Sequence, residues 1–473
     1  MRKTRPAAAV TSEGPLLRML TDTIAAIATP LGEGGLAVIR VSGPAALSLA
    51  DQCFRPSGRS SPRPSDAASH TVHYGWIHRN GSRVDEVLLT VMRAPRTFTR
   101  EDVVEVSCHG GLLSAKLVLD SFLSAGARSA EPGEFTRRAF VNGRIDLAQA
   151  EAIADVIHAR TELALAAARE QLGGSLSREV IALRDALMHV LAHVEAHIDF
   201  PDEDLTPDTR DHLFEQLRTA SGQIERLLRT AKEGQVLRRG IRAAIVGSPN
   251  AGKSSLLNRL LGHDRAIVSP IPGTTRDTIE ETANIRGIPV VFIDTAGLRE
   301  AGDPLEEEGI RRSRQTLARA ELILHVIDGS LPSRAADRAQ ASELAGRPTI
   351  LVSNKADLPR PGGTPLKAVH QVEISCATGQ GIEELKDHIR ERVWSGSIDA
   401  EMLQVMINSR HQEALRRAEE ALLRTSAALG DGLSLELVAL DLHIATNAVG
   451  EIVGGTGRED LLDAIFSQFC IGK

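Results

Sequence analysis

The sequence predicts a multidomain protein, with an α+β domain first and an α/β domain inserted into a discontinuous α-helical domain. Short strands separated by turn residues fill the first part of the chain. Amphipathic helical stretches lie on both sides of a strand–loop–helix unit at 241–257. With 473 residues and 42% hydrophobic side chains, the chain can form several cores. The expected parts are an N-terminal segment at 1–21, the α+β domain at 22–141, helical parts at 142–238 and 397–473, and the α/β domain at 239–396.

The first domain is expected from four local patterns. Gly35 to Gly43 predicts a strand, and Pro44 then opens a short helix. Strands at 72–77 and 84–92 flank Asn80-Gly81, which is a strong hairpin signal. A strand at 101–111 precedes a helix near 112–125. His109 beside Cys108 could be catalytic or metal-binding, but a turn histidine at a strand end is the preferred interpretation, because no further ligands are spaced to join it.

The helical parts are predicted from apolar residues at helical spacing. The first long stretch begins at 145–157, and the glycines 173 and 174 interrupt it. Further helices continue to about residue 234, and the same pattern returns at 413–429, 433–449 and 459–469. The ends of an inserted domain lie close together, so such an insertion is physically easy.

Composition restricts the class of protein and its location. A net charge of −7 argues against a general nucleic-acid coat, which needs clustered Lys and Arg. Four cysteines without paired spacing indicate a reducing compartment, and no apolar run is long enough to cross a membrane. We therefore expect a cytoplasmic protein. The first twenty residues lack the apolar core of a secretory signal; a disordered start is preferred over an organelle-targeting peptide.

The region 247–254 matches the phosphate-binding pattern G-x-x-x-x-G-K-[ST]. Its glycines let backbone N–H groups converge on phosphate oxygens at a helix N-terminus. Lys253 would bridge the terminal phosphates, and the Ser254 hydroxyl would bind Mg²⁺. The preceding strand and the following helix are the context that this motif requires.

Four further motifs follow in the order of a GTPase. They are the segment 269–277, in which Thr275 could complete the magnesium shell, the D-x-x-G stretch from Asp294, the stretch Asn354 to Asp357, and Ser375-Cys376-Ala377, which resembles the loop that backs the base in GTPases. Asp357, in Asn354-Lys355-Ala356-Asp357, can accept both adjacent N–H donors of guanine, a pair that adenine lacks. The expected guanine-nucleotide contacts are Asn250, Ala251, Gly252, Lys253, Ser254, Ser255, Ser269, Ile271, Gly273, Thr274, Thr275, Asp294, Thr295, Ala296, Gly297, Asn354, Lys355, Asp357, Ser375, Cys376 and Ala377.

Hydrolysis needs a group other than glutamine. Where Ras-like enzymes place a water-orienting glutamine, this chain has Leu298. The following segment is rich in carboxylates, and Arg276 and Arg299 are candidates for neutralising transition-state charge. At the other end of the chain, Cys470 fits a prenylation box poorly, and the residues leave a structural or a reactive thiol open.

Several stretches resemble the tRNA modification GTPase MnmE (TrmE) family, a group of TrmE-Era-EngA-like GTPases. They are Pro132 to Ala152, Ile198 to Glu203, Gly273 to Asp277 and Phe469 to Lys473, and the likeness runs from about Thr23 to the last residue. The resemblance implies an N-terminal folate-binding domain that dimerises, a helical domain and an inserted G domain. Carried over by motif, the contacts to a 5-formyl-tetrahydrofolate or related folate would be Arg40, Glu105, Arg144 and Lys473.

The resemblance also implies the activity. Such proteins act on tRNA with a flavoprotein, MnmG (GidA), as a homodimer within a heterotetramer, and add aminomethyl or carboxymethylaminomethyl groups at C5 of the wobble uridine. Their GTP hydrolysis is potassium-activated. The K⁺ ligands would be Asn250, Ser269, Ile271 and Thr274, and Glu306 would orient the attacking water. The likeness also favours a functional thiol at Cys470.

The alternative is a ribosome-assembly GTPase that binds rRNA, in the manner of the Era and Der families. Such proteins carry a basic RNA-binding domain after the G domain. Here the flanking helices carry many carboxylates, and a further domain precedes them. Modification levels of wobble uridine would separate the two hypotheses.

Overall fold

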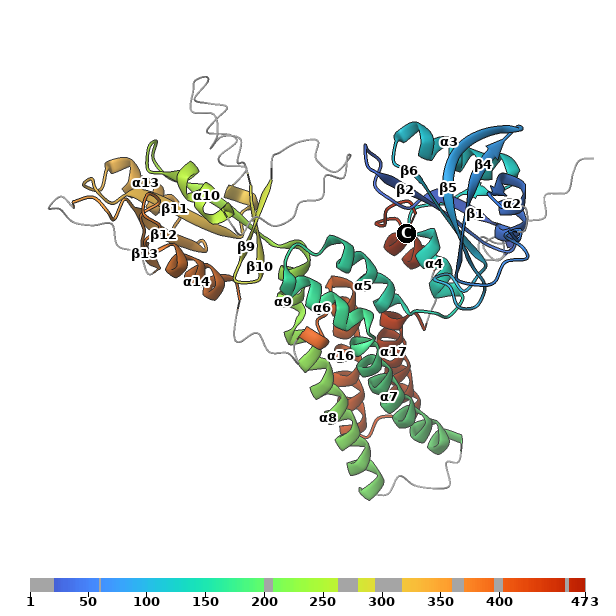
Figure 1. Ribbon diagram of the computed structural model, residues 1–473. Coiled ribbons are helices and arrows are strands. Elements are labelled where there is room, and N and C mark those ends of the chain that lie inside the picture. The colour runs from blue at the N-terminus through green and yellow to red at the C-terminus, as the bar shows by residue number, and fades with distance from the viewer. Residues whose placement is uncertain are drawn as a thin grey trace, which may run out of the picture. The chain divides into compact units, whose positions relative to one another are not determined.

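A computed structural model describes residues 21–58, 61–199, 207–262, 280–293, 317–359, 370–394, 403–455 and 459–472. The chain divides into two compact units, one of residues 1–150 with 456–473, the other of residues 151–455. Figure 1 shows both units and labels many of their helices and strands.

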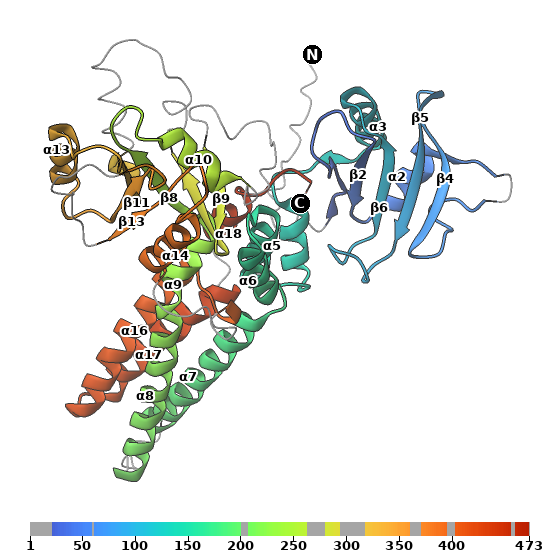
Figure 2. The same ribbon diagram turned by 60° about the vertical axis from the view of Figure 1, so that its left-hand side comes forward.

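A seven-stranded sheet forms the first unit. Its strand order is β3-β4-β5-β6-β2-β1-β7, with all neighbours antiparallel except β1 and β7. Strands β2, β6, β5 and β4 lie side by side in Figure 2. The strands are β1 Ile24–Ile27, β2 Leu36–Ser42, β3 Phe54–Pro56, β4 Thr71–Arg79, β5 Ser82–Met92, β6 Val103–His109 and β7 Arg128–Ser129.

The predicted hairpin is confirmed. Strands β4 and β5 pair antiparallel up to Arg79 and Ser82. Between them Asn80 and Gly81 have φ angles of 50° and 80°. Two successive residues at positive φ match the twist of the flanking strands, which is why Asn-Gly is favoured at this turn.

Helices cover both faces of this sheet. Helices α2 (Ala46–Cys53) and α3 (Leu112–Ala125) pack on one face, where Phe54, Phe122 and Leu89 are fully buried. On the other face, Phe135 of α4 (Glu134–Val141) packs against Ile24, Ala26 and Ala130. The strands therefore alternate between two apolar layers, as their period of two requires.

The end of the chain belongs to this first unit. Helix α18 (Glu459–Phe466) packs on α4, and Arg137 Nη1 lies 2.9 Å from Asp463 Oδ1. A Cβ at Gly133 would lie 2.6 Å from the carbonyl oxygen of Phe466, so the contact requires glycine. Residues 456–473 therefore group with the first unit, through the packing of α18 on α4, whereas the expected helical part ran over 397–473.

The second unit contains a bundle of long helices. Helices α7, α8, α16 and α17 pack against one another, and α5, α6 and α9 lie at one end of the bundle (Figure 1). Their bounds are α5 Leu147–His158, α6 Glu162–Leu172, α7 Ser175–Asp199, α8 Pro207–Arg229, α9 Ala231–Arg239, α16 Ser409–Gly430 and α17 Leu435–Val453.

The same unit contains an α/β domain between α9 and α16. Its six-stranded sheet has the order β13-β12-β11-β8-β10-β9, parallel except for β9. The strands are β8 Ile241–Val246, β9 Glu281–Ile285, β10 Ile288–Phe292, β11 Leu322–Asp328, β12 Thr349–Asn354 and β13 Gln371–Glu373. The helices are α10 Lys253–Leu261, α13 Ala335–Glu343 and α14 Ile382–Val393. The central strands are buried on both faces, as a parallel sheet covered by helices requires.

The segment leaving the α/β domain is fixed against the helix that leads into it. A Cβ at Gly234 of α9 would lie 2.4 Å from the carbonyl oxygen of Ile407. Thr230 Oγ1 donates to the carbonyl of Val405 at 3.1 Å, and the Gln171 amide donates to that of Met406. The predicted fold class, with an α/β domain inserted between helices, is confirmed.

Candidate nucleotide-binding site

The phosphate-binding loop lies at the carboxyl end of β8. In open α/β sheets, ligands bind outside the carboxyl ends of the strands. Gly247 has a φ of 146°, and a Cβ there would lie 2.0 Å from the carbonyl oxygen of Val326. Gly252 has a φ of 99°, and its Cβ would lie 2.1 Å from Asn354 Nδ2. Both glycines of the motif are thus needed for close contacts with neighbouring strands.

Lys253 points back into this loop. Its Nζ donates to the carbonyl oxygens of Gly247 at 2.8 Å and Ser248 at 3.0 Å. Burial lowers the pKa of this ammonium below its ordinary value. Ser254 and Ser255 are exposed in the first turn of α10, where the helix N-terminus favours an anion. A cation and a helix N-terminus therefore meet at one loop, which suits phosphate.

A carboxylate behind the loop is a feature that the sequence analysis missed. Asp337 is the buried residue of α13, and its Oδ1 accepts from Ser248 Oγ at 2.5 Å. Its Oδ2 accepts from the Arg334 N–H at 3.2 Å, which caps α13. Buried His325 also lies near this carboxylate, and its burial lowers its pKa. Asp337 thus fixes Ser248, whose carbonyl oxygen in turn accepts from Lys253.

Asn354 joins the phosphate loop to the loop that follows β13. It is 2% exposed. Its Nδ2 donates to the carbonyl of Ala251 at 2.9 Å, and its Oδ1 accepts from the Cys376 N–H at 3.1 Å. The Asn354 side chain therefore links the phosphate loop to the loop after β13, which are the two ends of the expected nucleotide site.

The other residues of the expected base-binding motif follow Asn354 in the chain. Lys355 has a φ of 68°, and its Nζ lies 2.5 Å from Asp328 Oδ2. Asp357 is exposed, as the reading of a base edge requires. Burial raises the pKa of the Cys376 thiol, and the negative charge of Asp357 adds to that effect. Ser375, Cys376 and Asp357 therefore lie around one end of the site.

A second cluster lies on the N-terminal sheet, on the face covered by α4. Arg40 and Glu105 are directly opposite each other on β2 and β6, and Arg40 Nε donates to Glu105 Oε1 at 2.8 Å. The Arg40 guanidinium lies 6.0 Å from the centre of the Phe98 ring, and that of Arg144 lies 5.2 Å from it. Gly472 brings its carbonyl oxygen within 3.4 Å of Arg40. Three of the four expected folate residues are thus brought together.

Two family models match the chain. The model of the MnmE helical domain matches residues 147–470, and that of the GTP-binding protein TrmE N-terminus matches residues 23–144. The tRNA modification GTPase MnmE of Chloroflexus aurantiacus is 52% identical over 460 residues, which is 96% of this chain and 100% of that protein. The chain belongs to the tRNA modification GTPase MnmE family. The MnmE of Geobacter metallireducens is 49% identical over the same shares of both chains.

Among solved structures, the G domain of the T. maritima FeoB iron transporter is 28% identical. The match covers 32% of this chain and 98% of the FeoB domain, with a TM-score of 0.24.

Several expected site residues of this MnmE-family chain lie outside the described residues. For the nucleotide, they are Ser269, Ile271, Gly273, Thr274, Thr275, Asp294, Thr295, Ala296, Gly297 and Glu306. The folate residue Lys473 also lies outside, as do Leu298, Arg276 and Arg299. Their roles stay predictions. Of the four expected K⁺ ligands, Asn250 lies within the described residues; it is exposed, with a φ of 64°.

The structure also describes the surroundings of His109 and of three cysteines in the N-terminal unit. His109 ends β6, and its Nδ1 lies 2.7 Å from Asp85 Oδ1, which raises the pKa of this exposed imidazole. Burial raises the pKa of Cys53 and of Cys108 to about 11. Cys470 is exposed, and its carbonyl oxygen accepts from the Gly133 N–H at 3.4 Å. Its role stays a prediction.

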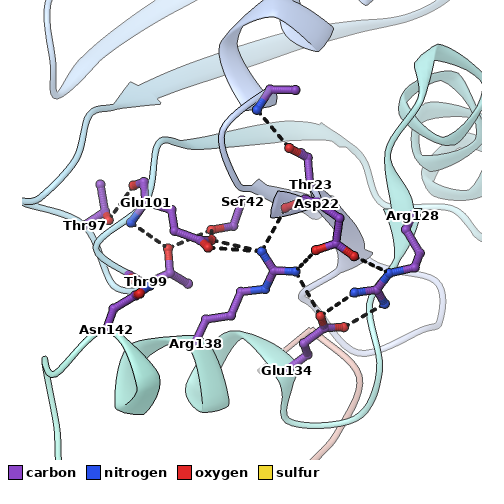
Figure 3. Close-up of polar contacts among 11 residues, drawn as sticks. Asp22, Thr23, Ser42, Thr97, Thr99, Glu101, Arg128, Glu134, Arg138 and Asn142 are labelled. Carbon is purple, nitrogen blue, oxygen red and sulfur yellow. Dashed lines mark hydrogen bonds and ion pairs between the residues drawn. The ribbon is translucent and has the colours of Figure 1, made fainter. Parts of the chain in front are cut away.

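A buried charge network surrounds Arg138 of α4 in the MnmE-family motif 132–152 (Figure 3). Arg138 is 1% exposed and donates to Asp22, to Glu101 at 3.1 Å and to Glu134 at 3.0 Å. Arg128 donates to both carboxylate oxygens of Glu134, at 2.6 and 3.0 Å. The network joins α4 to the start of β1 and to the loop before β6. Its members come from distant parts of the sequence, so sequence spacing does not predict the network. The sequence indicated it only through the several Arg and Glu residues of the motif 132–152.

A second network joins α5 to the start of α16. Glu151 accepts from Arg410 Nε at 2.8 Å and from Asn408 Nδ2 at 3.0 Å, and His411 Nε2 lies 2.8 Å from it. Burial alone would raise the pKa of Glu151, but the bonds from His411 and Arg410 outweigh it and lower that pKa. Burial lowers the pKa of His411, whose Nδ1 accepts from the Asn408 N–H.

No helix among the described ranges is long and apolar enough to span a membrane. Those ranges also contain no group of three or more His, Cys, Asp or Glu that could hold a metal ion.

Proposed function

We propose that this chain is a GTP hydrolase that acts in tRNA modification. With a flavoprotein partner of the MnmG (GidA) type, it takes part in adding carboxymethylaminomethyl or aminomethyl groups at C5 of the wobble uridine. The observation that carries the proposal is the bridge that Asn354 makes between the phosphate loop and the base loop. The relatives, at about half identity over 96% of the chain, are named tRNA modification GTPases.

Guanine recognition is assigned to Asp357. Its carboxylate would accept from the N1–H and the 2-amino group of guanine together. ATP would leave this carboxylate without donors, and a site built to pair with such donors discriminates against a nucleotide that lacks them. The exposed position of Asp357 beside Cys376 leaves its two oxygens available to a base.

Phosphate binding is assigned to the loop 247–254. Lys253 would exchange its bonds to the loop carbonyls for the terminal phosphate oxygens, and the first turn of α10 would donate backbone N–H groups. Ser254 with Thr275 would hold Mg²⁺, which neutralises charge on the phosphates. Asp337 and Ser248 would keep the loop in the geometry that Lys253 needs.

Hydrolysis is proposed to depend on potassium and on Glu306. Asn250, with oxygens of Ser269, Ile271 and Thr274, would hold a K⁺ ion whose charge stands where other GTPases place an arginine. Glu306 would accept a hydrogen bond from the attacking water, since Leu298 has no polar atom for that purpose. Exposure of the Asn250 side chain at the edge of the phosphate loop fits this assignment.

The N-terminal cluster is proposed to bind a formylated tetrahydrofolate. Arg40 and Arg144 could pair with the carboxylates or ring oxygens of a folate, Glu105 could accept from ring N–H groups, and Lys473 would add a cation. The Phe98 ring, which lies near both guanidinium groups, offers an apolar surface. We further propose a cytoplasmic homodimer that forms a heterotetramer with the flavoprotein and binds tRNA.

Two experiments test the proposal. Mass spectrometry of tRNA nucleosides from cells lacking this gene should show loss of the modified wobble uridines. Normal levels would favour the rRNA-binding assembly role instead. GTPase assays of the purified protein should give faster turnover in KCl than in NaCl. Equal rates would contradict the proposal that K⁺ activates hydrolysis.

A further inference from the structure

One backbone N–H in the loop beside the expected guanine site lacks an acceptor among the described residues. In the turn 375–380, five of the six amides have one. These are Ser375 to Gln380 O at 2.9 Å, Cys376 to Asn354 Oδ1 at 3.1 Å, Thr378 to Ser375 Oγ at 3.1 Å, Gly379 to Ser375 O at 2.8 Å and Gln380 to Thr378 Oγ1 at 3.4 Å. The remaining amide belongs to Ala377, which is exposed. Its N–H is therefore available to a ligand.

Arg259 fixes the direction of that N–H. It lies in the last turn of α10, the helix that begins at Lys253. Its Nε donates to the carbonyl oxygen of Cys376 at 2.8 Å, and its Nη2 donates to that of Ala377 at 2.8 Å. A trans peptide is planar, so the Cys376 carbonyl and the Ala377 N–H point in opposite directions. Once Arg259 holds the carbonyl, the N–H must point away from α10.

The preceding peptide group, between Ser375 and Cys376, is also held. Asn354 accepts from the Cys376 N–H, so the peptide groups on both sides of Cys376 have charged or amide partners. Asp357 is close enough to Cys376 to raise the pKa of its thiol. A purine whose N1–H is bound by Asp357 presents the neighbouring substituent, the one at C6, on the same edge. In guanine that substituent is a carbonyl oxygen, which is an acceptor.

We propose that Arg259 is a positioning residue that directs the Ala377 N–H to donate to the C6 oxygen of a bound 6-oxopurine. The proposal rests on the assignment of Asp357 as the reader of N1 and the 2-amino group. A donor at this point selects against adenine, whose 6-amino group would face it. Donation to the Cys376 carbonyl by a guanidinium also polarises the peptide and strengthens its N–H as a donor.

The test compares three nucleotides by competition with a fluorescent GDP analogue. GDP has the C6 oxygen, N1–H and 2-amino group; IDP lacks only the 2-amino group; 2-aminopurine riboside diphosphate lacks the C6 oxygen and the N1–H. Arg259→Ala should weaken GDP and IDP about tenfold each, the size of one charge-assisted hydrogen bond. It should change 2-aminopurine riboside diphosphate less than threefold. Arg259→Lys, which has no planar fork, should lie between Arg259→Ala and the wild type.

Arg286→Ala is the matched control. Arg286 is another exposed arginine of this domain, and it pairs with Asp387 and Glu383 of α14 instead of with the base loop. The control should bind all three nucleotides like the wild type. An equal loss for all three in Arg259→Ala, or no loss for any, would overturn the proposal. Failure of the Asp357 assignment has a different signature, since the wild type would then bind GDP and IDP equally.

Discussion

Asn354 should couple the two ends of the nucleotide site, and Asn354→Ala tests this. The substitution removes one hydrogen bond to Ala251 and one from Cys376. Each bond contributes about 1 kcal/mol net, so the smallest expected loss is about 2 kcal/mol. The Ala251 carbonyl and Cys376 amide are left without their partner, which raises the loss toward ~4 kcal/mol. Without these bonds the nucleotide must itself restore the binding arrangement of the two loops, so guanine nucleotide affinity should fall by as much as roughly 30-fold to 1000-fold.

The assay is titration of a fluorescent GDP analogue into the purified variant, with the melting temperature measured on the same sample. Asn284→Ala is a suitable control. Asn284 Oδ1 accepts from the Gly287 N–H at 2.8 Å in the β9–β10 turn, so its loss affects a turn of the same domain without touching the nucleotide loops. The reasoning is refuted if folded Asn354→Ala binds within threefold of the wild type, or if Asn284→Ala loses as much affinity.

Three further predictions concern separate contacts. Asp357→Asn should weaken GTP and favour xanthosine nucleotides, because the amide offers a donor where guanine needs an acceptor; competition binding that still prefers GTP would contradict this. Ser248→Ala should weaken GTP binding about three- to tenfold, because it removes the hydrogen bond to Asp337. Ser248→Thr keeps the hydroxyl and should bind GTP like the wild type. Equal affinities of the two variants would disprove a role for this hydrogen bond. Glu151→Gln should lower the free energy of unfolding by about 3 kcal/mol at neutral pH, because Arg410 loses its charged partner. The folded pKa of Glu151 is below the unfolded value of 4.5, so this stabilisation is present above pH 4.5 and is lost as the pH falls through the folded pKa. Urea titrations should therefore show that the difference in free energy of unfolding between wild type and Glu151→Gln becomes smaller at acid pH. A difference that does not change with pH would contradict a stabilising role for the ionised Glu151 carboxylate.

The features that the sequence predicted are local ones. The Asn80-Gly81 turn and the helix at 112–125 each follow from a few neighbouring residues, and the structure has them at those positions. The strand, glycine loop and helix around Lys253 are likewise local, since each glycine allows a backbone conformation that other residues resist.

The features that the sequence did not predict join distant residues. Arg410 lies 259 positions from Glu151, and Asp337 lies 89 positions from Ser248. No spacing rule pairs such residues, because their contact depends on how whole helices pack. Arg259 lies only a few residues after the phosphate-binding motif 247–254. Helical periodicity nevertheless predicts only that it is an exposed arginine. Its two bonds exist because the turn after β13 comes to lie beside the end of α10.

The contact between Gly234 and Ile407 limits how this architecture can be rebuilt. The inserted domain enters and leaves through two backbone segments that lie so close that no side chain fits between them at residue 234. A chimaera that exchanges the nucleotide domain with that of a relative must therefore keep a glycine there and keep the path of 405–407. If either changes, the exchanged module loses its fixed attachment to the helices, even if it still binds nucleotide.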